Sequence, residues 1–277
     1  MITWFDKHAR SLPWRSPDVT AWGILVSEFM LQQTQVDRVI PKWHEWMRTW
    51  PTPAALAAAP LADVLRAWQG LGYPRRAMRL HASAQAIVDN FDGQVPNSEA
   101  QLLGLPGVGH YTAAAVAAFA FGQPTLVLDT NIRRVIARAW AGVASMPAHL
   151  TNAERELAAS LVTDANGALW SAAVMELGAR ICTARAPRCP ECPLQASCLW
   201  LAAGRPQNGP QARKQPAFAG SDRQARGALL KAVSVGEELS SVEQAWSDAV
   251  QRERALASLL ADGLIARTPT GYALPRN

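Results

Sequence analysis

Residues 105–116 read LPGVGHYTAAAV, and this stretch decides the fold of the first two hundred residues. Gly107 and Gly109 flank Val108 in a tight apolar turn, and an alanine-rich run follows. The surrounding pattern predicts a helix that ends near Leu103 and a second helix that begins near Tyr111, which together make a helix-hairpin-helix. Glycines let backbone N–H groups approach a phosphate, and the dipole of the second helix adds a favourable field. A turn that only connects two helices, with no ligand, is the alternative.

The composition predicts a folded globular protein with a polyanionic partner. The chain has 277 residues, of which 49% are hydrophobic and 18% charged, and its formal net charge is +5. A basic balance of this size favours nucleic acid without proving it. The charged N-terminus is unlike a signal peptide, and no uncharged apolar run is long enough to span a bilayer. We therefore expect a cytoplasmic protein with no membrane partner.

Helical periodicity dominates the first two hundred residues, and convincing strand alternation is absent there, so this part is predicted to be all-α. Apolar residues in the segment 21–33 recur at helical spacing, which predicts an amphipathic helix with Glu28 on the flank of its apolar stripe. A carboxyl in that position can be partly desolvated, although an ordinary surface residue is the alternative. Further helices are predicted over residues 54–59, 61–69, 75–90, 98–103, 111–121, 131–141, 152–161 and 170–181.

The composition changes after the last cysteine, which predicts a domain of residues 1–202, a basic linker of residues 203–223 and a small unit of residues 224–277. From Cys198 through Lys231 there are six cationic residues and one acid, so the linker is either a solvated tether or a strap that tracks phosphates. Helical patterns at 226–233, 241–246 and 249–261 precede two short strands joined by a turn at 269–271. This order predicts a winged-helix-like unit.

All four cysteines lie in one short segment with the spacing C-x6-C-x2-C-x5-C. They are Cys182, Cys189, Cys192 and Cys198. Their clustering favours a metal site in a reducing compartment over disulfide bonds. Zinc sites usually show two C-x2–4-C pairs, and only one such pair is present here.

The order and spacing of several motifs resemble the DNA glycosylase superfamily that contains endonuclease III and the MutY-type adenine DNA glycosylases, with the MutY branch matching best. The motifs are RSLPWR (10–15), SEFMLQQTQV (27–36), GLGY (70–73), LPGVGHYTAAAV (105–116), LDTNIRRV (128–135) and the cysteine segment (182–198). The resemblance implies a two-lobed helical enzyme of base excision repair, with a [4Fe–4S] cluster on the four cysteines. It also implies a monomer that binds double-stranded DNA containing a mismatched adenine.

The same resemblance implies roles for individual residues. Glu28 would protonate adenine N7 and Asp129, otherwise a simple helix N-cap, would stabilise the sugar cation, with Tyr111 and Asn131 lining the pocket. The DNA-binding residues would be Arg10, Leu12, Trp14 and Arg15 around the flipped base, Gln33 and Tyr73 as wedges in the duplex, and Leu105, Gly107, Val108 and Gly109 in the hairpin. The bifunctional endonuclease III branch has a Schiff-base lysine at the position of Tyr111, so this chain is predicted to release a base without cutting the strand.

Three departures from the MutY pattern stand out. Thr130 replaces the usual glycine between the aspartate and the asparagine, and Pro74 replaces a second aromatic residue after Tyr73. Residues 224–277 are too short for the Nudix-like domain that many family members use to read 8-oxoguanine. The predicted activity is monofunctional release of adenine mispaired with 8-oxoguanine or guanine. The alternatives are a thymine or uracil mismatch glycosylase on the same scaffold and a non-catalytic iron–sulfur DNA-binding regulator.

Overall fold

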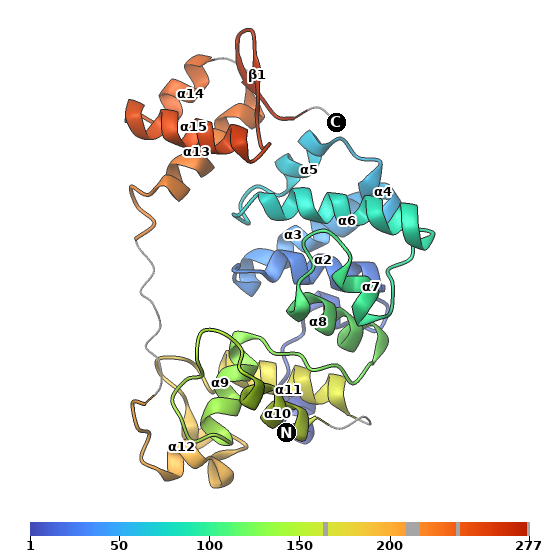
Figure 1. The fold of residues 1–277 in the computed structure, drawn as a ribbon, viewed down its shortest axis with the longest axis vertical. Coiled ribbons are helices and arrows are strands. Elements are labelled where there is room, and N and C mark those ends of the chain that lie inside the picture. Colours follow the sequence, from blue (N-terminus) through green and yellow to red (C-terminus); the bar gives the residue numbers. More distant parts are fainter. Residues whose placement is uncertain (163–165, 209–216, 237–238, 276–277) are drawn as a thin grey trace. The chain divides into compact units, whose positions relative to one another are not determined.

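The computed structural model describes residues 1–162, 166–208, 217–236 and 239–275, which divide into two compact helical units (Figure 1). Unit 1 comprises Met1–Ile24, Asn97–Leu103 and Val108–Arg213, and unit 2 comprises Leu25–Pro96, Gly104–Gly107 and Lys214–Asn277. Within the described residues the only sheet is a strand pair near the C-terminus, so the predicted all-α architecture is confirmed.

Unit 1 is built on a core of small and branched apolar side chains. Its helices are α1 (Ile2–His8), η1 (Pro13–Arg15), α7 (Glu99–Leu103), α8 (His110–Phe121), α9 (Thr130–Ala139), α10 (Asn152–Leu161), α11 (Gly167–Arg180), η2 (Cys189–Glu191), η3 (Gln195–Ser197) and α12 (Leu199–Ala202). The alanines of α8 are buried on several sides, which lets α11 pack closely against it. Gly122 ends α8 with φ 67°, a left-handed conformation that favours glycine.

Unit 2 begins within α2 (Ala21–Leu31) and continues through α3 (Val36–Thr49), α4 (Pro53–Ala57), α5 (Leu61–Ala67) and α6 (Arg75–Phe91). A tryptophan cluster stabilises it, because the ring of Trp46 meets those of Trp50 and Trp68 edge-on at centroid distances of 4.6 and 5.4 Å. One prediction for α2 is wrong. Every residue from Trp22 to Met30 is buried, so the helix has no polar flank.

Three of the described α-helices, α1, α3 and α12, were not predicted from the sequence. Helix α3 contains Pro41, which normally signals a helix end because proline lacks an N–H and crowds the preceding turn. Here the helix continues through Pro41, and its apolar side carries the buried residues Val39, Trp43 and Trp46. Burial of these large side chains outweighs the single lost hydrogen bond.

The predicted three helices and strand pair of the C-terminal segment are confirmed. The elements are α13 (Asp222–Val235), α14 (Leu239–Ala245), α15 (Ala249–Ala261), β1 (Ala266–Thr268) and β2 (Gly271–Ala273), with β1 antiparallel to β2. Asp262 forms ion pairs with Arg226 of α13 at 2.6 Å and with Arg75 of α6 at 3.4 Å. The C-terminal segment therefore contacts α6. The linker residues Arg213 and Lys214 lie outside the described residues.

None of the described helices is long and apolar enough to cross a membrane.

Candidate active site and DNA-binding residues

In unit 1, Asp129 is the N-cap of α9. Its Oδ1 accepts a hydrogen bond of 2.6 Å from the Ile132 backbone N–H, and its Oδ2 accepts one of 2.7 Å from Asn131 Nδ2. Burial raises the pKa of the Asp129 carboxyl, while these hydrogen bonds and the charge of Arg134 oppose the rise without cancelling it. The carboxylate is therefore held in one orientation in a partly desolvated position.

Asn131 is fixed from its other side. Its Oδ1 accepts a hydrogen bond of 2.8 Å from Arg134 Nη2, and the same nitrogen donates to the carbonyl of Gly178 at 2.6 Å. A Cβ on Gly178 would lie 2.8 Å from Asn131 Cβ, so only glycine allows α11 to approach α9 this closely. The amide of Asn131 therefore points its nitrogen at Asp129.

Tyr111 is the second residue of α8, directly after the hairpin turn, and its half-buried side chain packs against the unit 1 core. It carries a phenol where the bifunctional branch has an amine. Tyr111 lies at the start of the helix, as predicted. Because its side chain has no amine, it offers no Schiff-base nucleophile.

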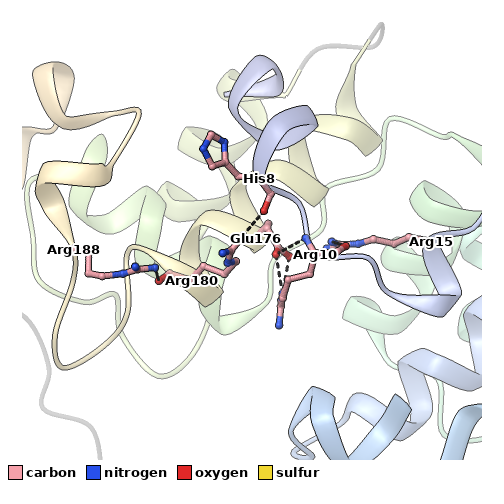
Figure 2. A network of polar contacts seen from close by, with 6 residues as sticks. All are labelled: His8, Arg10, Arg15, Glu176, Arg180 and Arg188. Atoms are coloured by element: carbon pink, nitrogen blue, oxygen red, sulfur yellow. Dashed lines mark hydrogen bonds and ion pairs between the residues drawn. The ribbon is translucent and has the colours of Figure 1, made fainter. Parts of the chain in front are cut away.

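The N-terminal segment, which the resemblance assigns to the flipped base, is held by a carboxylate that was not among the predicted residues. Glu176 of α11 is 0% exposed and pairs with both arginines (Figure 2). Arg10 binds it through Nε at 2.7 Å and Nη2 at 3.0 Å, and Arg15 binds it through Nη2 at 3.0 Å. Leu12 and Trp14, between them, are buried.

The charge state of Glu176 follows from competing effects. Burial alone would raise the pKa of its carboxyl, but the hydrogen bonds from Arg10 and the charges of Arg15 and Arg10 outweigh burial and lower it. Glu176 is thus ionised at neutral pH and leaves a net positive charge on the three-residue cluster.

The same polar network extends to the cysteine segment. Arg180 of α11 donates to the backbone carbonyl of His8, and Arg188 Nη2 donates to the carbonyl of Arg180 at 2.9 Å (Figure 2). Helix α11 therefore connects the N-terminal segment to the loop that carries the four cysteines.

The four cysteines face one small pocket, which Arg138 and Trp200 also line. No disulfide joins these four described cysteines. Burial raises the pKa of Cys192, and the three neighbouring thiols raise it further, so the sulfur atoms are close enough to interact. Arg138 Nη1 lies 3.5 Å from Cys182 Sγ and donates to the carbonyl of Thr183 at 2.7 Å. Within the described ranges, no group of three His, Cys, Asp or Glu residues is arranged to hold a metal ion.

In unit 2, Glu28 lies near the end of α2 and is only 5% exposed. The alternative of an ordinary surface residue is wrong, because Glu28 lies on a helix whose residues from Trp22 to Met30 are all buried.

The hairpin turn requires glycine for a steric reason. Gly107 has φ 81°, and a Cβ there would lie 2.6 Å from Arg79 Cβ and 3.1 Å from Phe29 Cε1. Leu105 and Val108 are buried, whereas Gly109 is exposed and is the N-cap of α8. The two apolar side chains thus anchor the turn, and Gly109 is left exposed at the start of α8.

Known proteins share this architecture. Residues 26–159 match the family model "HhH-GPD superfamily base excision DNA repair protein". The chain is 50% identical over 275 residues to "Adenine DNA glycosylase" of Mycolicibacterium smegmatis, a match that covers 98% of this chain and 93% of that protein. It is 48% identical to "Adenine DNA glycosylase" of Mycobacterium tuberculosis, with 99% and 92% covered. The chain belongs to the MutY-type adenine DNA glycosylases.

The fold of the glycosylase resembles the solved structure of a thermostable thymine-DNA glycosylase, with a TM-score of 0.66. The two are 28% identical, and the match covers 73% of this chain and 93% of that one. The helix-hairpin-helix fold expected from the motifs is therefore confirmed.

Two buried charged residues of the glycosylase, Glu176 and Arg76, were not among the predicted site residues. Glu176 is the one acid in the apolar sequence of α11, and that isolation was a signal in the sequence. Arg76 is 6% exposed, but its neighbours Arg75 and Arg79 are exposed, and no sequence signal separates the three.

Proposed function

We propose that this glycosylase acts as a cytoplasmic monomer on double-stranded DNA, where it hydrolyses the N-glycosidic bond of adenine mispaired with 8-oxoguanine or guanine. The observation that carries the proposal is the pair of carboxyls in contrasting settings. Glu28 is buried on an apolar helix, whereas Asp129 caps a helix and accepts two hydrogen bonds that offset part of the rise in its pKa caused by burial.

Each carboxyl has a chemical task in this reaction. Adenine leaves readily only when its ring is protonated, and Glu28 supplies that proton at N7 and then positions or deprotonates the attacking water. The sugar gains oxocarbenium character as the bond breaks, and the ionised Asp129 stabilises that charge. Because the base must leave the stack to be reached, wedge residues and a pocket for the flipped base are needed as well.

The substrate can be tested against the alternatives in one assay. Duplexes carrying A:8-oxoG, A:G, T:G, U:G and thymine glycol are scored for base release and for strand cleavage under single-turnover conditions. We expect release of adenine from the first two and no strand cleavage. Release of thymine or uracil would indicate a thymine or uracil mismatch glycosylase. Binding without release of any base would indicate a non-catalytic DNA-binding regulator.

Introducing a nucleophile at the start of α8 is expected to change the reaction class. Tyr111→Lys should form covalent complexes with abasic DNA that borohydride traps, because the amine can attack the sugar as a Schiff-base nucleophile. Tyr111→Met is the control of similar length without an amine. Efficient trapping by the parent protein would contradict a monofunctional mechanism.

We also propose that Cys182, Cys189, Cys192 and Cys198 hold a [4Fe–4S] cluster. The convergence of all four thiols on one pocket, beside the cation of Arg138, supports this assignment. A cluster binds each thiolate to a different iron, so its ligands need not surround a single ion. Bound there, the cluster would supply structural support for the loop that carries Arg185 and Arg188, which we expect to face DNA.

The cluster proposal predicts about four irons per chain and broad visible absorbance in anaerobically purified protein. Cys192→Ser should lower the iron content, the folded yield and the DNA affinity together, because metal binding is coupled to folding of its loop. Stoichiometric zinc without iron in the parent protein would refute the cluster.

Removing the charge of Glu176 is expected to destabilise the N-terminal segment in a pH-dependent way. Because its folded-state pKa is lowered, its contribution to stability is present above the ordinary carboxyl pKa and is lost as pH falls through the folded value. Glu176→Gln should cost about 2 kcal/mol of unfolding free energy at pH 7, since two arginines lose their buried partner but can rehydrate. Thermal denaturation at pH 7 and in acid should show the difference shrinking as pH falls.

Glu45→Gln is the matched control, because Glu45 pairs with Lys42 at the surface. Its effect should stay within about 0.5 kcal/mol. An equal loss in both variants, or a Glu176→Gln loss independent of pH, would contradict the assigned role.

A further inference from the structure

Two exposed residues on different loops of unit 2 share an unusual backbone. Gln33 has φ 57° and Tyr73 has φ 49°, in the left-handed region that non-glycine residues rarely adopt. Each such conformation costs about 1–3 kcal/mol and persists only where the surroundings enforce it. Tyr73 is also 41% exposed, so its own burial does not enforce it.

A single guanidinium reaches both loops. Arg76 Nη1 donates to the carbonyls of Phe29 at 2.8 Å, Met30 at 2.9 Å and Gln32 at 2.5 Å. Its Nη2 donates to Thr34 Oγ1 at 2.9 Å and to the carbonyls of Leu71 at 3.0 Å and Gly72 at 2.9 Å. In the first loop the contacts fall on Gln32 and Thr34, on either side of Gln33. In the second they fall on Leu71 and Gly72, directly before Tyr73. Arg76 thus binds the backbone beside each strained residue.

Two more contacts join the loops. The hydroxyl of Thr34 donates to the carbonyl of Leu71 at 3.0 Å, which bridges them directly. The guanidinium of Arg76 also lies over the ring of Tyr73 at 5.7 Å and over that of Trp68 at 5.2 Å. The arginine therefore restrains the side chain of Tyr73 as well as the backbone before it.

The position of Arg76 is costly for a helix residue. It is the second residue of α6, where a cation opposes the helix dipole, and burial lowers its pKa to about 10. At neutral pH it is still protonated, so a desolvated cation remains in place. Arginine offers two separate NH2 groups in one planar fork, so Nη1 and Nη2 together reach acceptors on both loops, which the single ammonium of lysine cannot do.

We propose that Arg76 is a positioning residue that holds Gln33 and Tyr73 together as one preorganised wedge for opening the DNA duplex. The inference rests on the proposed function, because the wedge role of these two residues belongs to it. Preorganisation matters here because ordering the two loops on binding costs free energy. That cost would reduce the binding energy left to unstack a base. The carbonyls of Phe29 and Met30 lie at the end of α2, so the same contacts also fix the helix that carries Glu28.

The test measures unstacking without adenine release. The full-length protein is bound at saturation to a duplex with 2-aminopurine beside a tetrahydrofuran abasic analogue, well below the melting temperature of every variant. We expect the parent to brighten the fluorophore, and Tyr73→Ala and Arg76→Gln each to reduce the unstacked-to-stacked ratio about tenfold, the size of one base–aromatic contact. The double variant should show no further loss, because both changes remove the same wedge.

Two further variants separate positioning from stability. Arg133→Gln is the matched control, since Arg133 also holds loop carbonyls, with 2.6 Å to that of Pro147. It should lower the melting temperature and leave the fluorescence unchanged. Thr34→Val removes the hydroxyl that bridges the loops but keeps the guanidinium of Arg76. It should also reduce the fluorescence. This second variant keeps the test valid if Arg76→Gln folds poorly.

Additive losses in the double variant, or parental fluorescence in Arg76→Gln and Thr34→Val, would overturn the inference. A parent protein that leaves the fluorophore stacked would overturn it too. Failure to release adenine in the separate duplex assay would instead contradict the proposed function, because the fluorescence test contains no adenine target.

Discussion

Replacing Glu28 by glutamine is expected to abolish adenine release while leaving mismatch binding largely intact. The change removes a proton donor and little volume from a buried position. Loss of a well-placed general acid slows a reaction by about 10²–10⁴-fold, and by more where the leaving group depends on protonation. Single-turnover excision of adenine opposite 8-oxoguanine measures the rate, and a filter or gel assay with the same duplex measures binding.

Glu154→Gln provides the control for this experiment. Glu154 is also a buried glutamate, but it pairs with Arg133 at 2.6 Å in unit 1 and has no proposed chemical role. It should lower stability and leave the excision rate near that of the parent. Near-parental excision by Glu28→Gln would refute the proposed acid.

Replacing Asp129 by asparagine is expected to slow excision by about 10²–10³-fold without destabilising the protein. The rate falls because the amide carries no charge to stabilise the sugar cation. Burial raises the pKa of Asp129, so its contribution to stability is present below the ordinary aspartate pKa and is lost as pH rises through the folded value. The ionised form therefore costs stability at neutral pH, and the neutral amide, which also caps helices well, avoids that cost.

Thermal denaturation and single-turnover kinetics check both parts. At pH 7 the melting temperature of Asp129→Asn should equal or exceed that of the parent, and the advantage should disappear in acid. Excision by the parent should also decline, as pH falls, at a higher pH than an ordinary aspartate would cause. A variant that is both active and less stable at pH 7 would show that Asp129 is only a helix cap.

Local features of the sequence determined much of this protein. The glycine turn at 105–116, the cap before α9 and the cysteine spacing each depend on residues close together in the chain, and such features are readable from order alone. The order of the motifs predicted the family, which the comparisons confirm. Helix α3 shows where local rules mislead, because proline usually interrupts a helix, yet α3 continues through Pro41 and buries Trp43 and Trp46.

The tertiary structure alone decided which charged residues are buried and what they hold. Glu28, Glu176 and Arg76 are all buried in the structure, and their short-range sequence context does not set how deeply. Glu176 meets Arg10 across 166 residues, and Arg76 meets Phe29 across 47. Desolvation and partner geometry depend on which segments pack together, and that packing arises from the whole core, not from any local pattern. The types of reactive group were therefore visible in the sequence, whereas the restraint and environment of each group came only with the fold.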